Sequence, residues 1–232
     1  MRVGGRRTMT VLPEAEAAET VAVLDAGGIV VLPTRRWYML CADSTHAEAC
    51  RRLFEGKGRP STKPLALVMA SDAAVTAEFS FSSTARRLAE GLWPGDLALL
   101  LPWLKPESAQ ERSWLGTRTA MVTRDPGVLG KVAAMTRNPP AVTVVSRSNG
   151  QDAEERQPAL SPAEVRRFVE RTSMPVDMLV DGGVCPLGRG LTVVDCSSTP
   201  RLVREGAVHA RAVSHVLGGA ECEVEVRPSA AP

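Results

Sequence analysis

Short apolar runs separated by helix signals limit what this chain can fold into. The apolar runs at 29–32 and 97–101 have the length of buried strands. A helix signal occurs at Ser161-Pro162-x-Glu164, where a cap, a first-turn proline and a capping-box glutamate are in register. Segments of these two kinds alternate without the long regular spacing of a doubly wound fold. We therefore expect an α+β (mixed α/β) fold, in which helices flank a twisted sheet.

The other elements follow from periodicity, caps and turn residues. Helices are expected over 14–26 and 45–54, in two segments of 72–91, over 126–136 and from 161 onward. Further strands are expected at 37–42, 65–69, 119–123, 141–145, 178–181 and 191–195. Residues 102–114 lack a clear period and are interpreted as a surface loop or an irregular insertion. The polar segment 151–158 is interpreted as mobile.

The length and charge of the chain favour one ordinary globular domain. Its 232 residues are enough for a sizeable core. We expect a single domain over residues 10–226, with flexible termini at 1–9 and 227–232. The 28 cations and 26 anions give a net charge of +2, which is too balanced for general adhesion to nucleic acid or membranes.

Neither a membrane protein nor a disulfide-rich protein is indicated. No apolar run approaches the roughly 18 residues of a membrane span, and no apolar stretch follows the basic start of the chain. We therefore expect a cytoplasmic location and no membrane partner. The five cysteines are scattered, which favours free thiols. No spacing of cysteines and histidines suggests a zinc site, so no metal held by the protein is expected.

A basic loop occupies residues 56–65, where Lys57, Arg59 and Lys63 fall within seven residues. The prolines after Arg59 and Lys63 restrict the backbone, whereas glycines at 56 and 58 allow close approach to a bulky group. Such a loop suits an anionic ligand, because lysine is a point charge and arginine is a fork for phosphate or carboxylate. The alternative is a basic loop that only faces water.

Standard phosphate-binding motifs are absent from the sequence. It contains no G-x-x-x-x-G-K-[ST], and no G-x-G-x-x-G follows a strand. We therefore expect that any bound phosphate is held by side chains and loop amides rather than by a P-loop.

The motifs around the basic loop resemble those of the YrdC family. In chain order they are 28–34 with Tyr38, Lys57-x-Arg59-Pro60 with Lys63-Pro64-Leu65, 93–95, 146–150, 188–195 and 204–207. They lie within residues 14–208, nearly the whole chain. The resemblance implies a twisted open sheet with a large concave face. It also implies synthesis of threonylcarbamoyl-adenylate from L-threonine, bicarbonate and ATP, with release of pyrophosphate, for tRNA modification.

The resemblance also implies roles for individual residues. Lys57 and Arg59 match the catalytic cation pair that grips the ATP phosphates, where they would neutralise developing charge. The substrate-binding positions correspond to Thr34, Tyr38, Lys63 and Thr192. The nucleotide-binding positions correspond to Lys57, Arg59, Ser146, Ser148, Asn149 and Arg204. Mg²⁺ would be carried by the nucleotide, and no protein nucleophile is needed, since the amine attacks bicarbonate and the carbamate attacks the α-phosphate.

Several positions depart from the family pattern. The family's Pro-Thr-[Asp/Glu]-Thr-x-Tyr-Gly-Leu is here Pro33-Thr34-Arg35-Arg36-Trp37-Tyr38-Met39-Leu40, so an acid, a hydroxyl and a glycine are replaced. The bulk of Met39 predicts a different pocket floor. The family's Arg-x-Pro strand end corresponds to 121–123, with Arg124 adjacent as a substitute for the lost arginine. Leu191 replaces a serine.

The family's Ser-Ala-Asn stretch can be matched to residues 146–149 in three registers. If Ser146 is the family serine, Ser148 replaces the asparagine. If Asn149 is the family asparagine, Arg147 stands at the serine position. A one-residue deletion would instead keep both Ser148 and Asn149. The sequence leaves the three registers open.

Three functions are compatible with these observations. The first is threonylcarbamoyl-adenylate synthesis, with a substrate preference that arginines at 35, 36 and 147 would shift toward a more anionic substrate. A variant of it is a specialised paralogue of secondary metabolism that makes a carbamoyl-adenylate or a carbamoylated small molecule. The second is a non-catalytic module that binds RNA or a nucleotide, against which the single tyrosine weighs. The third is a partner that hands a carbamoyl intermediate to a separate transferase.

Overall fold

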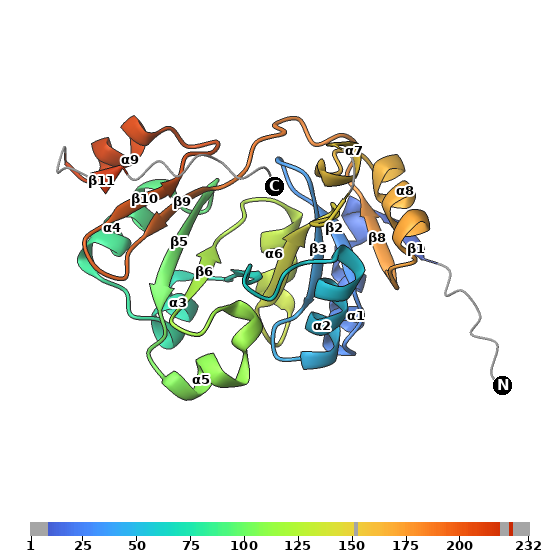
Figure 1. Ribbon diagram of the computed structural model, residues 1–232, viewed down its shortest axis with the longest axis horizontal. Coiled ribbons are helices and arrows are strands. Elements are labelled where there is room, and N and C mark those ends of the chain that lie inside the picture. Colours follow the sequence, from blue (N-terminus) through green and yellow to red (C-terminus); the bar gives the residue numbers. More distant parts are fainter. Residues whose placement is uncertain (1–8, 151–152, 219–222, 225–232) are drawn as a thin grey trace.

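Eleven strands form one sheet in the computed structural model, which describes residues 9–150, 153–218 and 223–224 (Figure 1). The first six are β1 (Thr10–Pro13), β2 (Val30–Pro33), β3 (Tyr38–Asp43), β4 (Ala66–Val68), β5 (Leu97–Pro102) and β6 (Thr119–Thr123). The others are β7 (Pro140–Val144), β8 (Met178–Asp181), β9 (Thr192–Asp195), β10 (Arg201–Arg204) and β11 (Glu223–Val224). Their order across the sheet is β1-β8-β2-β3-β7-β4-β6-β5-β9-β10-β11, in parallel and antiparallel pairs.

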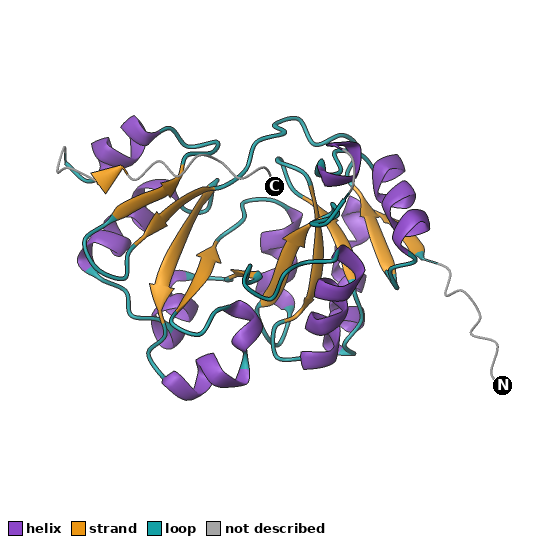
Figure 2. Cartoon of the chain, viewed as in Figure 1, coloured by secondary structure: helices purple, strands orange, loops and turns teal. Residues whose placement is uncertain are grey.

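Helices lie on both sides of this sheet (Figure 2). The first five are the 3₁₀ helix η1 (Glu14–Glu19), α1 (Thr20–Asp25), α2 (Ala47–Lys57), α3 (Asp72–Glu78) and α4 (Ser83–Leu92). The others are α5 (Pro106–Glu111), the 3₁₀ helix η2 (Ser113–Leu115), α6 (Val128–Met135), α7 (Ala153–Arg156), α8 (Pro162–Thr172) and α9 (Ala210–Val216). The predicted α+β architecture, a twisted sheet flanked by helices, is confirmed.

Alternate strand residues point to opposite faces of the sheet, so the sheet has a core on each face. The larger core lies on one of these two faces. Leu40 of β3 and Leu67 of β4 are fully buried in it. They share this cluster with Leu53 of α2, Leu88 of α4 and Val165 of α8. This packing fixes α2, whose last turn carries Lys57, against the strands.

The opposite face is covered by helices over only part of its width. Near β2 and β3, Leu32 packs in a cluster with Leu24 of α1 and Leu129 of α6. Near β5 and β6, the half-buried Leu100 and Met121 belong to a small cluster in which none of the described residues comes from a helix. This part of the face, over which no described helix packs, corresponds to the expected open side of the sheet.

Two local predictions were wrong. The segment predicted to be an irregular insertion contains helix α5, which begins with Pro106 in its first turn and buries Ala109. The helix predicted over 45–54 begins two residues later, at Ala47, because the Thr45 hydroxyl donates to Asp43 and does not cap the helix. The cap of α2 is instead His46, whose Nδ1 accepts from the amide of Ala49, and the helix continues to Lys57.

Other predictions were confirmed or lie outside the described residues. Strand β6 matches its predicted bounds, and Ser161 and Glu164 form the predicted capping box of α8. Strands β1, β10 and β11 and helix α9 were not predicted. Of the segment predicted to be mobile, residues 151–152 are not described, and the helix α7 follows them. The predicted flexible termini fall almost wholly at residues that are not described, namely 1–8 and 227–232.

Within the described ranges, no helix is long and apolar enough to cross a membrane. The four described cysteines are free, as predicted, and the structure buries all four: Cys41, Cys50, Cys185 and Cys196. The same part of the chain holds no group of three or more histidine, cysteine or acidic side chains arranged to bind a metal ion.

Candidate functional site

The loops that carry the candidate residues meet at one end of the sheet. Strand β7 runs antiparallel to β3 with Val144 opposite Met39, so the segment after β7 lies beside the residues that precede β3. Helix α2 also ends there, because Lys57 bonds to this segment. Most of the residues singled out in the sequence come from these loops.

Lys57 is fixed by the loop that follows β7. Its ammonium donates to the carbonyl of Val144 at 2.6 Å and to the carbonyl of Ser146, and it lies 3.4 Å from the Ser146 hydroxyl. In return the amide of Ser148 donates to the carbonyl of Lys57 at 2.9 Å. The end of α2 and the loop after β7 are thus joined in both directions.

The Lys57 side chain is fully buried, and among the described residues its ammonium bonds to no carboxylate. Burial away from water lowers the pKa of Lys57 well below its usual range, and the nearby charge of Arg59 adds to this effect. An anion bound beside Lys57 would act in the opposite direction and favour the charged ammonium. The site therefore gains electrostatic stability when it takes up a negative charge.

Asn149 lies against Gly58, next to Lys57 and Ser146. Gly58 ends α2 with a left-handed φ of 58°, and a Cβ atom at this position would overlap the side-chain amide of Asn149. Ser146 and Asn149 therefore both reach the end of α2 by their side chains, whereas Ser148 reaches it by its backbone amide. The sequence alone could not choose among the three registers for residues 146–149, because the choice depends on the path of the loop after β7.

Arg59 is held by the proline-containing turn that follows it. Its Nε donates to the carbonyl of Lys63 and its Nη2 to the carbonyl of Pro64, both at 2.7 Å. Burial lowers the pKa of Arg59. Lys63 itself is exposed, so the turn fixes one cation and leaves the other at the surface.

Thr34 and Thr192 use their hydroxyls to fold the backbone. The Thr34 hydroxyl donates to the carbonyl of Trp37 at 2.8 Å and accepts from the amides of Arg36 and Trp37. The Thr192 hydroxyl donates to the carbonyl of Val208 and accepts from the amides of Gly206 and Val208. A hydroxyl has one proton and two lone pairs, so both groups are fully engaged.

Tyr38 ties the start of β3 to the loop after β8. Its hydroxyl donates to the carbonyl of Gly183 at 2.8 Å and accepts from the amide of Gly182 at 3.1 Å. Burial raises the pKa of Tyr38 to about 12. These contacts give Tyr38 a part in placing the loop of residues 182–191.

That loop, 182–191, crosses beside the segment between β2 and β3. The amides of Leu187 and Gly188 donate to the carbonyls of Arg35 and Arg36. At the loop's end, the exposed Arg204 donates from Nε to the carbonyl of Leu191 at 3.2 Å. The loop thus connects Tyr38, the segment 34–37 and Arg204.

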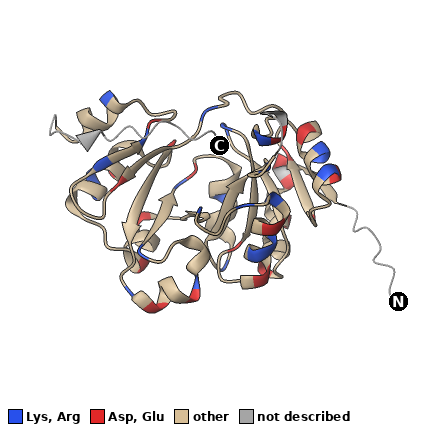
Figure 3. Cartoon of the chain, viewed as in Figure 1, with Lys and Arg blue, Asp and Glu red and all other residues tan. Residues whose placement is uncertain are grey.

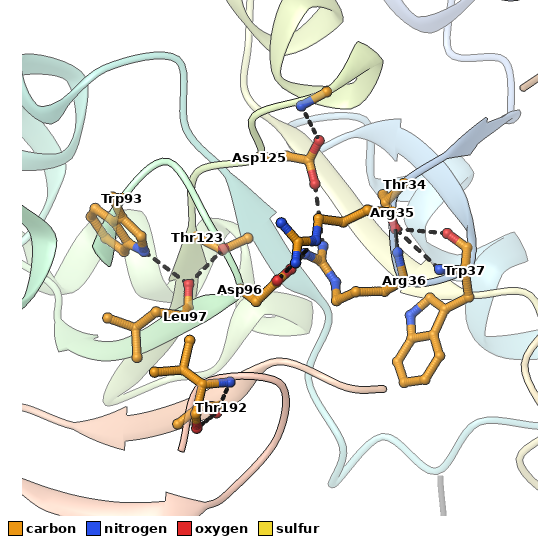
Figure 4. Close-up of polar contacts among 12 residues, drawn as sticks. Thr34, Arg35, Arg36, Trp37, Trp93, Asp96, Leu97, Thr123, Asp125 and Thr192 are labelled. Atoms are coloured by element: carbon orange, nitrogen blue, oxygen red, sulfur yellow. Dashed lines mark hydrogen bonds and ion pairs between the residues drawn. The ribbon is translucent and has the colours of Figure 1, made fainter. Parts of the chain in front are cut away.

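A buried ion cluster, which the sequence did not reveal, lies beside Thr34 (Figure 4). Arg36 is only 2% exposed; its Nη1 contacts Asp96 at 2.5 Å and its Nη2 contacts Asp125 at 3.3 Å. The Nε of Arg35 contacts the other oxygen of Asp96 at 3.1 Å. The two arginines and two aspartates balance in charge, so Arg35 and Arg36 do not by themselves make the site more cationic.

The acidic members of this cluster come from the two segments that flank β5 and β6. Asp96 directly precedes β5, and Asp125 follows β6. Burial raises the pKa of Asp125, while the charge of Arg36 acts against that rise. Arg36 therefore links the loop between β2 and β3 to two distant strands of the sheet.

The other altered positions lie apart from this cluster. Met39 packs among the apolar residues on the face covered by α1 and α6. Arg124 pairs with Asp72 of α3 at 2.7 Å, and the printed sequence reads Arg124-Asp125-Pro126, which is itself an Arg-x-Pro. The half-buried Arg147 donates its backbone amide to the carbonyl of Glu155. It lines a pocket with Ser146 and residues of α8.

Charged residues of both signs are spread along the described chain. Figure 3 shows lysine and arginine (blue) and aspartate and glutamate (red) on many of the same elements. This pattern agrees with the net charge of +2 for the whole sequence.

Comparison with known proteins gives consistent matches. The sequence model of the Sua5/YciO/YrdC family, described as "Telomere recombination", matches residues 22–206. The threonylcarbamoyl-AMP synthase of Bacillus subtilis is 26% identical over 208 residues, which are 88% of this chain and 57% of that protein. The protein of the same name from Halorhodospira halophila is 31% identical over 194 residues, 79% of this chain and 91% of that protein. The chain spans just over half the length of the first two curated relatives that it matches.

Solved structures share the fold. A structure of P. abyssi Sua5 in complex with L-threonine has a TM-score of 0.79 at 24% identity, and the match covers 94% of this chain and 62% of that one. E. coli YciO has a TM-score of 0.70 at 19% identity, with coverage of 89% and 98%. At these identities the likeness concerns the fold.

Proposed function

Because the chain belongs to the Sua5/YciO/YrdC family, we propose that it is an adenylate-forming enzyme that makes threonylcarbamoyl-AMP and pyrophosphate from L-threonine, bicarbonate and ATP. The observation that carries this proposal is the cluster of Lys57, Ser146 and Asn149 at the end of α2, with Arg59 fixed in the adjoining turn. In the cell the product would serve tRNA modification through a downstream carbamoyl transferase.

The chemistry needs placement and charge rather than a protein nucleophile. The amine of threonine attacks bicarbonate and water leaves, which gives a carbamate. A carbamate oxygen then attacks the α-phosphate of ATP, the bond to the β-phosphate breaks, and pyrophosphate departs with its electron pair. Lys57 and Arg59 would stabilise the charge that develops on the phosphates. Ser146 and Asn149 would orient the nucleotide or the carbamate beside them.

The residues present do not form a dedicated magnesium site. Among the described residues there is no cluster of three carboxylate or imidazole groups, and Asp96 and Asp125 are engaged by Arg36. A Mg²⁺ ion would therefore be held chiefly by the triphosphate, whose charge it would offset. The protein's part is to supply Lys57 and Arg59 to the oxygens that the ion leaves free.

A direct product assay tests the proposal. Purified protein is incubated with ATP, Mg²⁺, L-threonine and ¹⁴C-bicarbonate, and the labelled products are separated by chromatography. A labelled adenylate that requires both ATP and L-threonine supports the proposal. The absence of any labelled adenylate would overturn it, provided that a relative of known activity forms the product under the same conditions.

A second candidate is favoured by the ion cluster at Arg36. A buried arginine stands where the family has a small hydroxyl residue, so the amino-acid pocket beside Thr34 would differ in shape. A paralogue that carbamoylates another amine would fit this change. The same ¹⁴C assay with other amino acids in place of L-threonine separates the two. RNA binding without turnover is less favoured, because the net charge is only +2 and the sequence has a single tyrosine for base stacking.

A further inference from the structure

The expected substrate-binding hydroxyls have no free proton for a ligand. The protons of Thr34, Tyr38 and Thr192 are each donated to a backbone carbonyl. Each of these oxygens also accepts from at least one backbone amide. A substrate oxygen that needs a hydrogen-bond donor at this end of the sheet must therefore find another group.

Arg36 holds a buried N–H that is not engaged. Its two terminal nitrogens bond to Asp96 and Asp125, whereas its Nε is buried and takes no partner among the described residues. A buried donor without an acceptor is unfavourable, and the cost disappears when an acceptor binds. The backbone amide of Arg36 also bonds to the Thr34 hydroxyl, so this side chain starts beside Thr34, one of the expected substrate-binding residues.

The two aspartates fix the guanidinium in place. Asp96 is itself held by the Nε of Arg35, and both aspartates are less than one-tenth exposed. A guanidinium held at both terminal nitrogens cannot rotate freely, so its Nε–H keeps one direction. Such a fixed donor suits a planar oxyanion, that is, a carboxylate or a carbonate.

We propose that Arg36 is a specificity-determining residue that donates its Nε–H to a carboxylate or carbonate oxygen of the substrate. The proposal rests on the proposed function, which supplies two oxyanions of this chemistry: the carboxylate of the amino acid and bicarbonate. Asp96 and Asp125 act as positioning residues for Arg36.

Binding measurements without turnover test this assignment. L-threonine and L-threoninol, which lacks the carboxylate, are titrated by calorimetry, and binding of ¹³C-bicarbonate is followed by NMR. The protein variants are wild type, Arg36→Lys and Asp125→Asn, each with a thermal melt to confirm folding. If Arg36→Lys does not fold, the double variant Arg36→Met/Asp125→Asn keeps the cluster neutral and takes its place.

Loss of the Nε donor should lower the binding affinity for one of the two ligands by about 10- to 100-fold, as expected for a hydrogen bond to a charged group. If Arg36→Lys binds L-threonine more weakly than wild type does but binds L-threoninol equally well, the amino-acid carboxylate is the acceptor. If only the binding of bicarbonate is weaker, the carbonate oxygen is the acceptor. Asp125→Asn keeps a side-chain oxygen that can accept from the Nη2 of Arg36, so the donor stays in place while one negative charge is removed, and oxyanion binding should be unchanged or tighter. A cluster that only holds the fold together would weaken binding in both variants alike.

Two results would overturn the assignment in distinguishable ways. If the wild type binds L-threonine or bicarbonate and folded Arg36→Lys binds both equally well, Arg36 is not the donor while the proposed function stands. If the wild type binds neither ligand, with or without ATP, the proposed function and this assignment both fail.

Discussion

The Lys57 ammonium lies 3.4 Å from the Ser146 hydroxyl, although 89 residues separate them in the chain. This relationship joins the cation-rich segment at the end of α2 to the loop after β7. It also places the lysine, out of water, where its charge is best supported by a bound anion. The proposed activity depends on the cluster of Lys57, Ser146 and Asn149 as a whole more than on any one of these side chains.

Replacement of either catalytic cation should remove activity. Lys57→Ala and Arg59→Ala should each lower the rate of pyrophosphate release by about 100-fold or more, because each removes a charge from the developing transition state. Lys105→Ala, at an exposed lysine that precedes α5, is the matched control and should keep full activity. A fully active Lys57→Ala would mean that the site lies elsewhere.

Gly58 and Gly183 offer a matched pair of glycines with left-handed φ angles of 58° and 71°. Gly58→Ala adds a Cβ that overlaps Asn149, whereas Gly183→Ala places its Cβ in open space. Both pay about 1 kcal/mol for backbone strain, but only Gly58→Ala should also displace Asn149. We expect it to melt at a lower temperature and to raise the KM for ATP. Equal melting temperatures and equal KM values for the two variants would contradict this account.

Tyr38 is the sole tyrosine of the sequence, so its ionisation can be followed directly. The folded protein should show tyrosinate absorbance at 295 nm with a midpoint near pH 12, since burial raises the pKa of Tyr38 to about 12. The same titration in denaturant should have a midpoint of about 10. A midpoint near 10 while circular dichroism still reports the native fold would contradict the burial of this hydroxyl.

The same pKa difference predicts a loss of stability in alkali. Between pH 10 and pH 12 the unfolded chain has released the Tyr38 proton and the folded chain has kept it, so the free energy of unfolding falls as pH rises. The full effect is about 2.7 kcal/mol for two pKa units. Tyr38→Phe should lose this part of the pH dependence. Urea melts at pH 9.5, 10.5 and 11.5 measure the slope in both proteins, and identical slopes would contradict the prediction.

Loss of Arg36 should destabilise the fold strongly. Arg36→Met leaves Asp96 and Asp125 buried without their partner, which costs about 3–5 kcal/mol in comparable buried pairs. Arg51→Met removes an arginine from the exposed pairs with Glu48 and Glu55, and its melting curve should stay close to wild type. Urea melts of the two variants compare the sites. A wild-type midpoint for Arg36→Met would show that the ion cluster is not coupled to folding.

Local signals were sufficient for much of the fold and for part of the site. Strand β6 and the capped start of α8 follow from residues close in sequence, and so does the motif around Lys57. Helix α5 was missed because its six residues are too few to show a helical period. The end of α2 was placed too early, at residue 54, because residues from 56 onward were assigned to the basic loop, whereas Gly58 is the left-handed cap.

The ion cluster could not be found from local pattern at all. Asp96 and Asp125 follow Arg36 by 60 and 89 residues. Taken alone, each of the three is typical of an ordinary surface charge. Only the packing of β5 and β6 beside the segment 34–37 brings them together. For the same reason the sequence suggested extra positive charge at Arg35 and Arg36, whereas the structure pairs both with aspartate.

The most direct test of the central claim is pyrophosphate release by the purified protein with ATP, Mg²⁺, bicarbonate and each of the common amino acids in turn. The account predicts release that depends on bicarbonate and is strongest with L-threonine. Release that depends on bicarbonate and another amino acid would favour the paralogue with a different acceptor. No release with any amino acid, from a protein shown to be folded, would contradict the proposed function.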